Sequence, residues 1–72
     1  MNDIRIICGR NITKYRKKLG LSQRQLAKKV GISNASIGFY ETFVTLPRAE
    51  CLMWLAEALQ IQPYQLLMEN GD

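Results

Sequence analysis

Histidine is absent from this 72-residue sequence, and cysteine occurs only twice, as Cys8 and Cys51. These cysteines have neither the C-x-x-C spacing nor the histidine partners of a zinc site, so the sequence predicts no metal centre. Each is better interpreted as a small buried hydrophobic residue, although a disulfide between them is left open. The sequence also has no pair of carboxylates on one face and no phosphate-cradling glycine loop. We therefore expect neither an enzyme nor a bound cofactor.

Long apolar runs are missing as well. No segment approaches the roughly 20 consecutive apolar residues that a membrane-spanning helix needs. The apolar part of the opening "MNDIRIICGRN" is too short for a signal peptide. We therefore expect a cytoplasmic protein with no membrane part. The length fits one domain, residues 1–72, whose small core requires tight helix packing or association.

Acidic residues are scarce in the first half of the chain. Residues 1–30 contain nine of the ten Lys and Arg residues and a single acid, Asp3, so this part has a net charge of +8. Residues 41–72 contain five acids and one base, which gives −4, and residues 31–40 contain no charged side chain. This asymmetry indicates that the N-terminal half meets a polyanion, although a solvated basic face would have the same composition.

The spacing of apolar residues predicts an all-α fold of five short helices and no strand. One face of the first helix is formed by Ile4, Cys8, Ile12, Tyr15 and Leu19, and Gly20 is expected to end it. A fourth helix is expected to begin at Pro47, because proline suits the first turn. Its inner stripe is Leu52, Leu55, Ala56 and Leu59. Pro63 is expected to open a short last helix that holds Leu66 and Leu67.

The second and third helices form the clearest motif. Ser22 is an N-cap, and Gln25 three residues later completes a capping box. Gly31 breaks the helix after about two turns and suits a left-handed turn conformation. Ser33 then caps the next helix. Two short helices joined by a tight turn at a glycine form a helix-turn-helix, here over about residues 22–41.

The stretches "LGLSQRQLAKKVGIS" and "IGFYE" resemble the lambda repressor and Cro type of DNA-binding domain, the XRE family that includes phage repressors. The resemblance covers about residues 8–67, and "AEALQIQPYQLL" is similar to the family's closing helix pair. It implies a compact five-helix domain that binds double-stranded operator DNA as a homodimer, with the third helix in the major groove. It also implies a structural ion pair between Arg16 and Glu41, partly buried and costly to break singly.

The resemblance implies a set of DNA contacts along these two helices. Gln23 would contact a phosphate at a helix N-terminus, and Asn34 would bind adenine N6 and N7. Because the third helix has no arginine to bind guanine, base readout would rely on Asn34, on Ser36 and on contacts of Ala35 and Phe39 with thymine methyl groups. A·T-containing steps would then be favoured. The residues expected to bind DNA are Ser22, Gln23, Arg24, Ser33, Asn34, Ala35, Ser36, Phe39 and Thr42.

The sequence departs from the family pattern after the third helix. The family often has glycine near position 43, and Phe43 is a poor occupant of a positive-φ position. We therefore expect a differently shaped turn or a longer third helix. Trp54, where the family is usually polar, is a candidate interface anchor. The expected dimer interface is Phe43, Val44, Leu46, Pro47, Cys51 and Trp54, unless a chain terminus covers this patch.

Two functions from different classes follow. The first is a sequence-specific transcriptional regulator, resembling a phage repressor, that binds a palindromic operator as a homodimer at the nucleoid of a bacterial or phage-infected bacterial cell. The alternative is a protein-interaction module, such as an antitoxin or anti-repressor partner, that uses the apolar patch of Phe43–Leu46 and Trp54. A steep fall of affinity with salt would indicate phosphate binding and separates the two.

Overall fold

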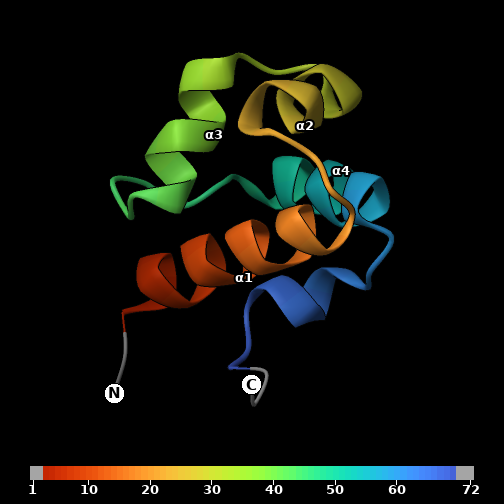
Figure 1. Cartoon of the computed structure of the whole chain (residues 1–72). Coiled ribbons are helices and arrows are strands. Elements are labelled where there is room, and N and C mark those ends of the chain that lie inside the picture. Colours follow the sequence, from red (N-terminus) through yellow and green to blue (C-terminus); the bar gives the residue numbers. More distant parts are fainter. Residues whose placement is uncertain (1–2, 70–72) are drawn as a thin grey trace.

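The computed structural model describes residues 3–69, and in this range the chain forms α-helices and one 3-10 helix, with no strand (Figure 1). The elements are α1 (Ile4–Lys18), α2 (Gln23–Val30), α3 (Asn34–Glu41), α4 (Ala49–Leu59) and the 3-10 helix η1 (Pro63–Leu66). The all-α prediction is confirmed. The expected fifth α-helix is wrong in kind, because the N–H groups of Gln65 and Leu67 reach carbonyls only three residues back.

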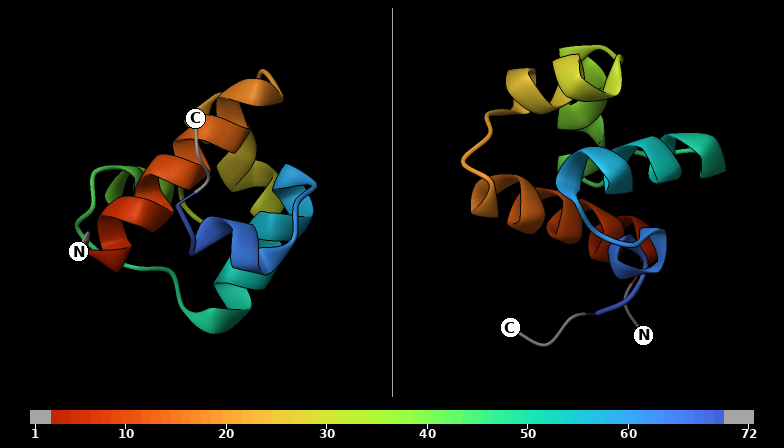
Figure 2. Two further views of the ribbon diagram at one scale, coloured as in Figure 1. Left: turned by 90° about the horizontal axis from the view of Figure 1, so that it is seen from below. Right: turned by 90° about the vertical axis from the view of Figure 1, so that its right-hand side faces the viewer.

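The helix-turn-helix forms one end of the molecule. Figure 1 shows α2 and α3 together above α1, and the side view in Figure 2 shows α4 between this pair and η1. Helix α3 packs on both α1 and α2, whereas α4 packs on α1, α2 and η1. The outward face of α3 is thereby left free, while its inward face is held by two neighbouring helices.

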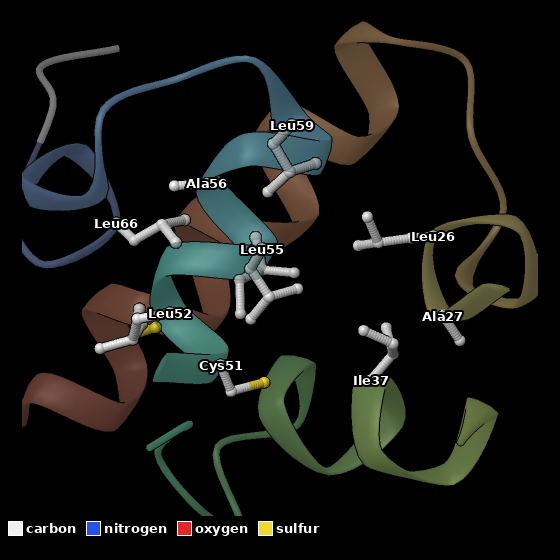
Figure 3. Packing of buried hydrophobic residues seen from close by; sticks show 11 residues of the cluster. Leu26, Ala27, Ile37, Cys51, Leu52, Leu55, Ala56, Leu59 and Leu66 are labelled. Carbon is white, nitrogen blue, oxygen red and sulfur yellow. The ribbon is translucent and has the colours of Figure 1, made fainter. Parts of the chain in front are cut away.

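Helix α4 supplies the centre of the core. Leu55 is fully buried, and Figure 3 shows it between Leu26 and Ile37 of the helix-turn-helix on one side and Leu66 of η1 on the other. Burying each such side chain stabilises a fold by about 1.5–3 kcal/mol. One continuous core therefore connects the helix-turn-helix to the C-terminal elements, so α3 is held by the whole fold rather than by α2 alone.

A close approach between α1 and α3 depends on Gly9. A Cβ atom built at this position would collide with the Tyr40 carbonyl oxygen and lie 2.7 and 2.9 Å from two carbons of the Phe43 ring. Phe43 itself has φ +69°, so the expectation that phenylalanine would avoid a positive-φ conformation here is wrong. The ring packs onto the space that Gly9 leaves open, and this contact offsets the backbone strain.

Replacing Gly9 with alanine is expected to lower the free energy of unfolding by about 1–3 kcal/mol, because the backbone of α3 must move away from α1. The matched control is Gly38→Ala. Gly38 also lies in a helix, but an added Cβ would meet nothing within 4 Å, so alanine should be neutral or stabilising there. Urea denaturation of both variants checks this. Equal stability of the two would contradict the packing argument.

Helix α4 starts later than the sequence predicted. Helix α4 begins at Ala49, not at Pro47, because the backbone of Arg48 is still extended, with φ −66° and ψ 161°.

The interpretation of both cysteines as buried small residues is confirmed: Cys8 is 1% exposed and Cys51 7% exposed, and both thiols are free. Burial raises the pKa of Cys8 to about 11, which keeps this thiol protonated and unreactive.

Candidate nucleic-acid interface

The turn between α2 and α3 has the predicted geometry. Ser22 Oγ accepts a hydrogen bond from the Gln25 N–H at 3.0 Å, and Gln25 Oε1 accepts one from the Ser22 N–H at 2.8 Å. Gly31 has φ +86° and donates its N–H to the Ala27 carbonyl. Ser33 accepts a hydrogen bond from the Ser36 N–H and so caps α3. The capping box and the glycine turn are therefore confirmed.

One face of α3 projects away from the molecule. Ile37 is completely buried against the core, whereas Ala35, Phe39 and Thr42 are exposed. These three residues are spaced by four and three positions, so they follow one line along the helix. Asn34 lies exposed at the first turn. The outward face of α3 is therefore open to an external partner along both turns of the helix.

Several polar side chains near this face already have partners within the protein. The hydroxyl groups of Ser33 and Ser36 are 2.8 Å apart, and the Thr42 hydroxyl donates to the Gly38 carbonyl at 2.7 Å. The Gln23 amide donates to Glu41 Oε1 at 3.0 Å. By contrast, the exposed side chains of Arg24 and Asn34 make no hydrogen bond within residues 3–69. Those two side chains are therefore the most available for an external partner.

The structure contains the ion pair that the resemblance implied. Arg16 donates from Nε to Glu41 Oε2 at 2.7 Å and from Nη2 to Oε1 at 3.0 Å, while its Nη1 donates to the Leu21 carbonyl. The two charged side chains are only 11% and 5% exposed. Arg16 thus joins α1, the following turn and the end of α3. The Gln23 amide adds the start of α2 to this network.

The carboxylate of Glu41 is the most consequential titrating group of this network. Burial acts to raise its pKa, but the hydrogen bonds from Arg16 and Gln23 and the charge of Arg16 outweigh burial, so its pKa lies below the ordinary value of 4.5. A lowered folded-state pKa means that the ionised form stabilises the folded chain. That contribution is complete above the unfolded-state pKa and is lost as the pH falls through the folded-state value.

The stability advantage of the natural chain over Glu41→Gln is accordingly expected to be largest near neutral pH and to shrink as the pH falls from about 5 to about 3. Glutamine cannot titrate, and every other carboxylate is present in both chains. The difference in stability between the two chains therefore reports the titration of Glu41. Urea denaturation of both chains across this range measures the difference. An advantage that stays constant down to pH 3 would contradict a lowered pKa at this position.

The apolar surface beyond α3 is smaller than the sequence predicted. Pro47 and Cys51 are buried, so the expectation that they lie on an exposed face with Trp54 is wrong for both. Phe43 and Leu46 are half-buried, because the ring of Phe43 covers Gly9 and Leu46 packs on the core. Large exposed apolar area remains at Val44, Met53 and Trp54, with exposed fractions of 59%, 62% and 48%. Met53, which the sequence reasoning missed, is adjacent to Trp54 on the outer side of α4.

A groove lies beside Trp54. It has a volume of about 320 Å³ and is lined by residues of the α3–α4 loop and by both helices, including Tyr40, Thr45, Leu46, Glu50 and Trp54. The loop that follows α3 and the outer face of α4 therefore share one concave surface. We call this concave surface the Trp54 groove.

None of the helices in residues 3–69 is long and apolar enough to cross a membrane.

Comparison with known families identifies the domain. A family model described as helix-turn-helix matches residues 12–66. The chain belongs to this helix-turn-helix family. Repressor protein C2 of Salmonella phage P22 is 43% identical over 66 residues, an alignment that covers 92% of the chain but only 30% of that relative. The resemblance to lambda-type phage repressors is therefore confirmed, and the chain spans about a third of the curated relative that it matches.

Solved structures of helix-turn-helix proteins have the same fold. The P22 c2 repressor, crystallised in complex with the synthetic operator 9T, is 41% identical with a TM-score of 0.83, and the match covers 88% of this chain and 96% of that chain. The hypothetical transcription factor NHTF from Neisseria has a TM-score of 0.90 at 27% identity, covering 93% of this chain and 77% of that chain. The arrangement of α2 and α3 is thus that of known regulators.

Proposed function

We propose that this helix-turn-helix chain binds operator DNA as a transcriptional repressor of the phage type. The observation that carries the proposal is the outward face of α3, with Ala35, Phe39 and Thr42 exposed in line, in a fold shared with a repressor solved on a synthetic operator. Helix α3 would lie in the major groove, where base edges distinguish all four base pairs. Such a role places the protein at the nucleoid of a bacterial or phage-infected cell.

Phosphate contacts would come from the start of α2. The first N–H groups of a helix have no partner within it, and the helix dipole favours an anion there. Ser22, Gln23 and Arg24 occupy this start, and Arg24 is exposed without an internal partner within residues 3–69. The serine pair of Ser33 and Ser36 would donate its remaining hydroxyl proton to the DNA backbone at the start of α3. Thr42 would contact the DNA backbone at the end of α3 once its hydroxyl exchanges the Gly38 carbonyl for a phosphate oxygen. The excess of basic residues before residue 31 would add charge.

We further propose that two copies bind together, paired through the Trp54 groove and Val44. Trp54 and Val44 expose large apolar area directly after and beside α3, where a monomer gains nothing from it. Pairing there would place two α3 helices on half-sites about one helical turn apart, 34–36 Å, which requires a palindromic operator. Phe43 and Leu46 are half-buried and would pack beneath this surface, without being part of the surface that contacts the second copy.

The proposal is tested by the salt dependence of binding to duplex DNA, followed by fluorescence anisotropy of a labelled duplex. If the protein contacts several phosphates, the logarithm of affinity should fall linearly with the logarithm of salt concentration. The slope should be about −0.9 for each phosphate that the protein neutralises. A protein-interaction module that uses the apolar groove would show no duplex binding, and its partner affinity would respond little to salt. Absence of duplex binding at about 50 mM salt would contradict the proposal.

Asn34→Ala is expected to relax base preference at one position of each half-site, at a cost of about 1–3 kcal/mol for the preferred base pair. The matched comparison is Arg24→Ala, which should weaken binding to every sequence alike and reduce the salt slope by about 1. Affinities for a set of single-base operator variants measure both effects. If Asn34→Ala lowers the affinity for every operator variant by the same factor, Asn34 contacts the DNA backbone and not a base.

A further inference from the structure

The ring of Phe39 is the most prominent feature on the outward face of α3. Its exposed fraction is 52%, whereas the residues in line with it, Ala35 and Thr42, have small side chains. The side chain therefore projects beyond its neighbours. The core does not need the ring, because Ile37 already fills the inward position of α3 and is completely buried. An exposed aromatic ring in the centre of a candidate binding face is well suited to contact an apolar partner.

The side chains around the ring limit what the helix can recognise by hydrogen bonding. The hydroxyls of Ser33 and Ser36 bond to each other, and the Thr42 hydroxyl donates to the Gly38 carbonyl. No charged side chain occurs between Val30 and Glu41. Asn34 is then the only polar side chain of α3 that makes no hydrogen bond within residues 3–69, while the Ser36 hydroxyl keeps only part of its capacity. Most of this surface is suited to apolar contact.

The floor of the major groove offers one apolar group, the methyl on C5 of a pyrimidine. Thymine carries it, and so does cytosine after methylation at C5. We propose that Phe39 is the principal specificity residue of α3 and that it recognises a C5-methylated pyrimidine. This inference rests on the proposed DNA-binding function and deepens it. The ring would contact the methyl group and not the hydrogen-bonding edge of the base. Methylation of cytosine would therefore change the affinity of this protein for its operator.

The test uses a duplex selected from a random pool by the natural protein. Each thymine is replaced in turn by deoxyuridine, which removes the methyl group and leaves base pairing intact. One thymine in each half-site is expected to show a loss of about fourfold, the equivalent of burying one methyl group. Phe39 is exposed, so Phe39→Ala should fold normally, and in this variant the same replacement should have no further effect.

A second arm separates the two sources of the methyl group. At the sensitive position, a C·G pair and a 5-methyl-C·G pair are compared, and methylation is expected to raise affinity about fourfold. A gain confirms recognition of both sources, whereas deoxyuridine sensitivity without this gain overturns the methylcytosine part. Tyr64→Ala is the control, because Tyr64 is as exposed as Phe39 but lies on η1.

Three results would overturn the inference. Duplex binding that is indifferent to deoxyuridine at every position would overturn it and leave the DNA-binding function standing. The same would follow if the deoxyuridine effect persisted unchanged in Phe39→Ala. Failure to bind any duplex would remove the proposed function, and this inference with it.

Discussion

Arg16→Met is expected to lower the free energy of unfolding by about 3–5 kcal/mol, because it leaves the Glu41 carboxylate buried without its positive partner. Methionine keeps most of the length and apolar area of arginine, so the loss reports the charge and its hydrogen bonds. The guanidinium donates to both oxygens of Glu41 and to the Leu21 carbonyl, and all of these acceptors would lose a donor together. For a 72-residue domain this amounts to a large share of the total stability.

Two further variants give this prediction its controls. Arg5 makes a similar bidentate contact with Asp3, from Nε to Oδ1 and from Nη2 to Oδ2, but both side chains are exposed, so Arg5→Met should leave stability unchanged. The double variant Arg16→Met with Glu41→Leu should recover much of the loss, because no buried charge remains. Denaturant unfolding of the four chains measures these differences. A loss for Arg16→Met no larger than that for Arg5→Met would contradict a structural role for the pair.

Val44→Asp is expected to reduce operator affinity by about 10²–10⁴-fold, the range of avidity that two linked half-site contacts provide. The substitution places a charge on a side chain that is 59% exposed in the single chain but would be covered in the proposed dimer. Folding should be unaffected, since an exposed residue is changed. Sedimentation of the protein and titration of a palindromic duplex together measure pairing and binding.

Tyr64→Asp is the matched control for this experiment, because it introduces the same charge at a side chain that is 62% exposed on η1 and does not line the Trp54 groove. Trp54→Ala should act in the same direction as Val44→Asp, through loss of an aromatic anchor. If Val44→Asp changes neither the association of the protein nor its affinity for DNA, this surface is not the dimer interface.

The helix-turn-helix could be predicted in detail because its determinants are local. The capping box of Ser22 and Gln25 lies within one helical turn, and Gly31 is required by its own backbone conformation. The pair of Arg16 with Glu41 is not local, and only the family resemblance implied it. Sequence patterns at short range therefore specified the helix-turn-helix, and resemblance supplied its long-range contact with α1.

The segment after α3 could not be predicted, because its conformation depends on a residue far away in the sequence. Phe43 adopts a positive φ, which is unfavourable for a residue with a large side chain. The space for its ring exists because residue 9 on α1 is a glycine. Once this loop is drawn onto α1 and α4, Pro47 and Cys51 become buried. A prediction made without knowledge of this loop could not anticipate that burial, so the apolar surface was predicted too large.

Selection of bound duplexes from a random pool at physiological salt tests whether two copies of this domain read DNA through α3. We expect an enriched palindrome whose half-site centres are about 10–10.5 base pairs apart, with a dominant T·A preference at the position facing Phe39. A folded, concentrated protein that enriches no sequence over the starting pool would contradict the claim.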